Sequence, residues 1–136
     1  RTRTGLSSAA GAFTVTDGGE QTIHEATGEV RLTRVSGTQL FKGGIVGEGS
    51  VEWMFCYRPD RSAVFVGFQR IEGSLDGRSG SLVMESTGDH DGRQSKGHWR
   101  VIAGSGTGEL AGISGEGSFD APGGPEVTYQ LDYQFD

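Results

Sequence analysis

The sequence is poor in the features that define several protein classes. Its 136 residues include one cysteine, Cys56, and three prolines, so no disulfide can form within the chain. No run of 18 apolar residues occurs, which excludes a transmembrane helix at the level of sequence. No charged-then-apolar leader is visible either. A lone cysteine and no leader together predict a cytoplasmic location.

Positive charge and clustered histidines are also scarce. The sequence has 12 lysines and arginines and 18 aspartates and glutamates, which gives a net charge of −6. An acidic surface repels nucleic-acid phosphates and anionic lipid headgroups, so we expect neither nucleic acid nor membrane as a partner. The three histidines, His24, His90 and His98, form no pair with metal-ligand spacing, and we expect no metal and no cofactor.

Glycine and period-two alternation dominate what remains. From Val127 to Phe135, five apolar residues alternate with four polar ones, which predicts a half-buried strand. Further candidate strands cover residues 13–16, 30–35, 38–41, 51–57, 63–71, 82–85, 97–102 and 117–121. Predicted turns separate them at Asp17–Gly19, Arg58–Arg61, Asp76–Gly77 and Asp91–Gly92. No amphipathic helix of ten residues occurs. We predict an all-β, eight-stranded antiparallel up-and-down barrel, with one domain over residues 1–136 and a flexible N-terminal segment over residues 1–9.

One glycine-rich segment has the spacing of a phosphate-binding loop. Gly106, Gly108 and Ala111 match G-x-G-x-x-A within GSGTGELAGISGEGSF. That motif needs a preceding strand and a following helix, whereas the sequence here allows only about one helical turn. We therefore predict a short helical turn, capped by Ser105 or Thr107, which folds Leu110 and Ile113 under one end of the barrel.

Several of these motifs occur in the order found in a known family. The segment from Val51 to Gly92, then Trp99, the glycine-rich segment and YQLDY at 129–133 resemble the bacterial family called domain of unknown function 3224. The likeness covers roughly residues 10–136. Members are similar in architecture to the allene oxide cyclase and dirigent barrels. The resemblance implies an eight-stranded barrel with a central cavity, commonly oligomeric, and no established reaction.

Aromatic residues at alternate strand positions suggest a lined interior. Such a lining either fills the barrel or leaves an apolar pocket with a few polar groups. The predicted ligand-contacting side chains are Trp53, Phe55, Gln69, His98, Trp99 and Tyr129. The family pattern favours Glu at the position of Gln69, which weakens any mechanism that needs two carboxylates there.

Three residues are candidates for proton transfer or hydrogen bonding to a substrate: Glu52, Tyr57 and Tyr133. Glu52 lies between Val51 and Trp53 on the strand face opposite the aromatics, where burial would raise its pKa. The alternative is a structural ion pair of Glu52 with Arg70 or Arg100.

The resulting functional hypothesis is a barrel that binds a small apolar molecule. By analogy with the cyclases among the related barrels, it would be a cofactor-free isomerase or cyclase acting on a polyketide- or lipid-like substrate. The alternatives are a non-catalytic, lipocalin-like binding protein and a structural oligomeric barrel. Apolar residues at Val64, Val66 and Phe68, on the face opposite Phe65, predict a surface for homo-oligomer formation.

Overall fold

Alternating residues form eight antiparallel strands in the computed structural model, which describes residues 6–136. The strands are β1 (Ser7–His24), β2 (Arg31–Gly43), β3 (Ile45–Tyr57), β4 (Ala63–Leu75), β5 (Arg78–His90), β6 (Ser95–Val101), β7 (Ile113–Ala121) and β8 (Glu126–Phe135). Each pairs with its neighbour in sequence, and β8 pairs back onto β1, which closes the barrel. The predicted fold class is confirmed.

The structure corrects several predicted boundaries. Asp17–Gly19 lies inside β1 rather than in a hairpin turn, because the ladder with β2 continues through Gly18 opposite Gly37. The extra residue at this point is absorbed by a bulge between Val15 and Asp17. The two candidate strands at 30–35 and 38–41 are one strand, β2. Residues 1–9 were expected to be a flexible segment, but residues 7–9 belong to β1, which begins at Ser7. Residues 1–5 lie outside the described residues.

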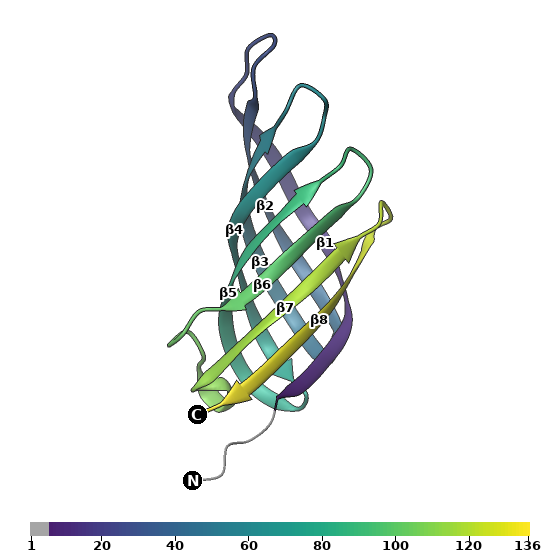
Figure 1. Cartoon of the computed structure of the whole chain (residues 1–136). Coiled ribbons are helices and arrows are strands. Elements are labelled where there is room, and N and C mark those ends of the chain that lie inside the picture. Colours follow the sequence, from purple (N-terminus) through teal and green to yellow (C-terminus); the bar gives the residue numbers. More distant parts are fainter. Residues whose placement is uncertain (1–5) are drawn as a thin grey trace.

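The barrel has two unlike ends (Figure 1). The tips of the β1–β2, β3–β4, β5–β6 and β7–β8 hairpins lie at one end, and the β1–β2 tip stands farthest from the opposite end, where β8 finishes. The β7–β8 tip is the lowest of the four in this view. This end is therefore oblique, because β1 has 18 residues whereas β6 has 7. We call it the open end.

The opposite, closed end is covered by a single helical turn, η1 (Gly108–Leu110), and the start of β7. Leu110 and Ile113 are both buried there, as predicted. Thr107 precedes η1 without capping it, since its hydroxyl accepts from the backbone N–H of Ser81. The glycine-rich segment leads into a strand, so it lacks the helix that a phosphate loop needs. Within residues 6–136 no helix is long and apolar enough to cross a membrane.

The interior between the ends is filled by aromatic rings that lie against glycines. Phe119 occupies the space of a side chain at Gly97, where an added Cβ would lie 2.1 Å from its Cζ. Phe65 does the same at Gly88, where the distance would be 2.5 Å. The rings also contact one another; the Phe13 and Phe41 centroids, for example, are 4.9 Å apart. Glycine in these strands therefore allows large rings to fill a narrow barrel.

Replacing Gly97 by Ala should destabilise the barrel. The new methyl group overlaps the Phe119 ring, which cannot move freely because it packs against Trp99 and Phe65. Overpacking of this kind costs roughly 1–3 kcal/mol. Thermal or urea unfolding would measure the loss. Gly19→Ala is the matched control, because an added Cβ there meets no atom within 4 Å. Equal unfolding midpoints for the two variants would contradict this account of the core.

Candidate functional site

The open end is where the interior meets solvent. The pairing of β1 with β8 ends at Thr14 opposite Glu126, so among the described strands residues 15–24 of β1 pair only with β2. Val15 faces inward opposite Gln39, yet 43% of it is exposed. A cavity of about 450 Å³ lies at this end, lined by Glu25, Ala26, Glu29, Arg31, Tyr57, Arg58, Pro59, Arg61, His90 and Gly92.

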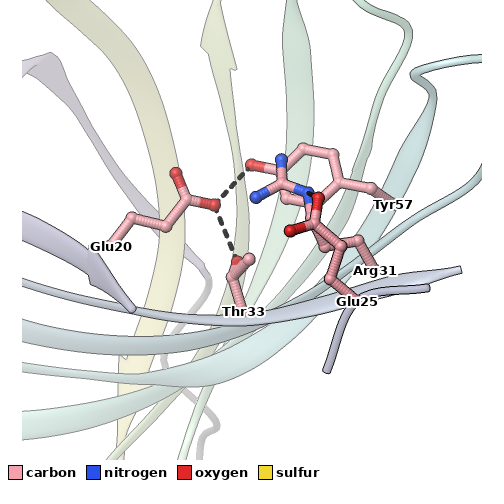
Figure 2. A network of polar contacts seen from close by, with 5 residues as sticks. All are labelled: Glu20, Glu25, Arg31, Thr33 and Tyr57. Atoms are coloured by element: carbon pink, nitrogen blue, oxygen red, sulfur yellow. Dashed lines mark hydrogen bonds and ion pairs between the residues drawn. The ribbon is translucent and has the colours of Figure 1, made fainter. Parts of the chain in front are cut away.

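A polar network lies beside this cavity (Figure 2), and its members Glu25, Arg31 and Tyr57 line the cavity. One carboxylate oxygen of Glu20, Oε2, accepts hydrogen bonds from the Thr33 hydroxyl at 2.7 Å and the Tyr57 hydroxyl at 2.9 Å. The Arg31 guanidinium lies 4.4 Å from the centroid of the Tyr57 ring, and its Nε is 3.9 Å from Glu25 Oε2. Strand pairing creates the network, because Arg31 lies directly opposite Tyr57 in the β2–β3 ladder.

The environment of Tyr57 fixes its protonation state. Partial burial raises the pKa of Tyr57 to about 12, and the hydrogen bond to Glu20 and the negative charge of that carboxylate act in the same direction. Arg31 opposes this rise with its positive charge. The phenol is therefore a proton donor at neutral pH, and it stays bound to the Glu20 carboxylate.

An aromatic wall connects this network to the filled core. The Tyr57 ring stacks on Phe55 with centroids 5.6 Å apart, and Phe55 stacks on Phe65 at 4.9 Å. On β3, Trp53 lies one inward-facing position deeper than Phe55, and its indole N–H donates to Ser86 Oγ at 3.0 Å. Trp53, Phe55 and Tyr57 are only partly buried. They thus form a ladder of rings that descends from the opening.

Below Trp53 the barrel is packed. Trp99 is 1% exposed, and its ring lies within 6.4 Å of those of Phe13, Phe41, Phe119 and Tyr129. The filled-core interpretation therefore describes the middle and the closed end. The family resemblance implied a central cavity, whereas the cavity described above lies at the open end.

Seven predicted site residues face the interior: Trp53, Phe55, Tyr57, Gln69, Trp99, Tyr129 and Tyr133. The other two, Glu52 and His98, lie on the outer face. Glu52 is not desolvated, since 63% of its side chain is exposed, and its Oε1 is 3.9 Å from Arg34 Nε. The alternative prediction, an ion pair of Glu52 with Arg70 or Arg100, is wrong in its partner, because Arg70 pairs with Glu72 and Arg100 with Glu85. Neither outer residue can reach a ligand inside the barrel.

The predicted tyrosines are not brought together. Tyr133 donates to the Asp76 carboxylate at 2.5 Å, in the β4–β5 turn at the closed end. Tyr129 accepts from the backbone N–H of Ile45 at 2.8 Å and donates to the carbonyl of Lys42 at 2.9 Å. Burial is the main cause that raises the pKa of both tyrosines. Their hydrogen bonds hold the β2–β3 and β4–β5 turns at the closed end in place. Both tyrosines lie far from Tyr57 along the strands.

Sequence reasoning missed the residues that complete the open end. Glu20 fell in a segment interpreted as following a turn, and the bulge at residue 16 shifts the alternation that would place it inside. Thr33 and Gln39 share the inward face of β2 with Val35 and Phe41, and this alternation was visible in the sequence. Among residues 6–136 no group of three His, Cys, Asp or Glu side chains could hold a metal ion.

Replacing Glu20 by Gln should lower the pKa of Tyr57 below about 12, because the hydrogen bond to a carboxylate and its negative charge are lost, while burial, the largest cause of the rise, remains. A phenol whose pKa is higher in the folded state contributes stability that is complete below about pH 10 and is lost as the pH rises through 12. NMR of the tyrosine Cζ carbons would follow the titration. Glu29→Gln is the control, since Glu29 lines the same cavity without bonding Tyr57. An unchanged Tyr57 titration in the Glu20 variant would refute the pair.

Comparisons with known proteins agree with the architecture. A family model described as "Protein of unknown function (DUF3224)" matches residues 9–133. A crystal structure of a DUF3224 protein of unknown function from Shewanella oneidensis MR-1 is similar with a TM-score of 0.77. Its sequence is 24% identical, and the match covers 96% of this chain and 98% of that one. No curated protein matches the chain. At this identity the likeness shows the fold alone.

Proposed function

Because the chain belongs to the DUF3224 family, whose description assigns no activity, we propose a function from the geometry of its own site: it binds a small, mainly apolar molecule at the open end of the barrel. The observation that supports this most is the cavity of about 450 Å³ next to the partly buried ladder of Trp53, Phe55 and Tyr57. Tyr57 is the ring of this ladder that lines the cavity, whose other lining residues are mostly charged, and Phe55 and Trp53 would supply the apolar contact deeper in the barrel.

The rim of the cavity favours a ligand with one polar group. Arg58 and Arg61 come from the β3–β4 loop, and Arg31 is held over the Tyr57 ring. Glu25 and Glu29 add negative charge on the β1–β2 side. An apolar body would contact the rings, while a polar or anionic group would lie among the arginines.

A second candidate function is cofactor-free isomerisation or cyclisation of that ligand, supported by the Glu20–Tyr57 pair. The Glu20 carboxylate is an acceptor that could take a proton from a carbon next to a carbonyl and return it elsewhere. Once Glu20 has taken up the proton, the Tyr57 hydroxyl would release Glu20 Oε2 and donate its single O–H to the developing oxyanion. Such a reaction would yield a product of unchanged mass and new chromatographic retention after incubation with the protein.

Ligand binding can be tested with 1-anilinonaphthalene-8-sulfonate, which joins aromatic rings to one anionic group. Tyr57→Ala should weaken binding roughly tenfold, because it removes ring contact and the surface on which Arg31 rests. Fluorescence titration would give the dissociation constants. Tyr133→Phe, at the closed end, is the control and should bind as the wild type does. Equal affinity of all three proteins would place the probe elsewhere and remove support for this site.

We also propose that the outer face of β3 and β4 joins two copies of the chain. Val64, Val66 and Phe68 are exposed there, the last to 53%, beside a hollow of about 290 Å³ between Met54 and Leu32. Across a two-fold axis, the exposed Phe68 ring of each copy would pack against the apolar hollow of the other.

Replacing Val66 and Phe68 together by Ser should convert the oligomer to a monomer, because the apolar contact is lost. Light scattering after size exclusion would report the mass. The matched control is Val46→Ser, which removes a 54% exposed apolar side chain near the other end of β3. A wild-type protein that runs as a monomer at tens of micromolar would end the proposal.

A further inference from the structure

Three buried side chains form a hydrogen-bonded chain whose direction is fixed. The indole Nε1 of Trp99 donates to Gln69 Oε1 at 2.8 Å, and Gln69 Nε2 donates to Gln39 Oε1 at 3.0 Å. An indole nitrogen can only donate. The Gln69 amide must therefore turn its oxygen toward Trp99, and it is left to donate to Gln39.

The last member of this chain lacks an acceptor. Gln39 is fully buried, and its Nε2 has no hydrogen-bond partner among residues 6–136. Turning the Gln39 amide over would not help, since it would set two NH2 groups against each other. Buried donors in folded proteins nearly always have a partner. Because Trp99 fixes the orientation of both amides, the Gln39 N–H groups have no acceptor among the described residues. An oxygen from outside the chain would satisfy them.

The amide nitrogen of Gln39 faces away from β3 and β4. A Cβ added at Gly49 on β3 would lie 3.1 Å from Gln39 Oε1, so the amide oxygen faces β3 and β4. Its nitrogen is turned away from them. On the other neighbouring strand Val15 lies opposite Gln39, faces inward and is 43% exposed. Solvent therefore reaches the Val15 side chain, whereas Gln39 itself is fully buried.

The surroundings specify a neutral oxygen. Charged side chains of β2, β3 and β4 near this height, Arg34, Glu48, Glu52 and Arg70, are exposed on the outer face. A carboxylate placed against Gln39 would be buried without a counter-charge, which is costly. A water molecule or a carbonyl oxygen has no net charge, so this penalty does not apply to it.

We propose that Gln39 Nε2 is a binding point for one neutral acceptor oxygen, supplied by water or by the carbonyl group of a small molecule bound at the open end. The carbonyl source rests on the proposed function, whereas the water source does not. If a carbonyl is the source, Gln39 selects ligands with a ketone, ester or amide at the end that enters the barrel.

The experiment observes the side-chain amide protons of Gln39 by NMR in the wild-type protein. Their resonances are assigned through the Gln39 Hγ protons, and Gln39→Met serves as a cross-check where it folds. In free protein a water-to-amide cross-peak would identify bound water. Acetophenone and ethylbenzene are then titrated as a matched pair, because they differ only by the carbonyl oxygen. The Tyr57 ring resonances report binding at the open end.

The outcomes separate the sources. A downfield shift of the Gln39 amide protons with acetophenone, absent with ethylbenzene, supports the carbonyl source. A water cross-peak that neither probe changes supports the water source. If the Tyr57 resonances are also unchanged by both probes, the result counts against the proposed function and not against the role of Gln39. No water cross-peak and no acetophenone shift, with Tyr57 responding, would overturn the inference and leave the open-end site standing.

Discussion

Closure of the sheet is the constraint on which the rest of the structure depends. Once β8 pairs with β1, every second side chain points into a space of fixed width. That space must be filled without overlap, so some of the large rings need a small residue opposite them on a neighbouring strand. Phe119 over Gly97 and Phe65 over Gly88 meet this requirement. The abundance of glycine in the strands is thus a packing property as much as a property of turns.

The same constraint divides the polar groups of the interior into two kinds. At the closed end, Tyr129 and Tyr133 bond to the backbone and to Asp76, and these bonds hold the turns in place. At the open end, Glu20 and Tyr57 bond to each other beside a cavity. Polar residues that support a turn and those beside the open-end cavity therefore lie at opposite ends of one barrel.

The sequence predicted the fold better than the site, and particular residues show why. Strict alternation from Val127 to Phe135 and from Val51 to Tyr57 placed those strands and their aromatic faces correctly. Alternation cannot tell how high along a closed barrel a side chain lies, so Tyr57 and Tyr133 looked equivalent. Glu20 was missed because Asp17–Gly19 has the composition of a turn, whereas the ladder with β2 runs through it. Partners such as Gln39 and Gln69 depend on strand register, which local composition does not contain.

The part of β1 that extends past β8 has a consequence for solubility. Residues 15–24 have a strand on one side only, and a free edge of this length can recruit a strand from another molecule and start aggregation. This edge carries the bulge after Val15, the charges of Asp17 and Glu20, and two adjacent glycines. Bulges and charges oppose edge-to-edge pairing. The residues that made this segment look like a turn therefore also oppose the pairing of this free β1 edge with a strand of another molecule.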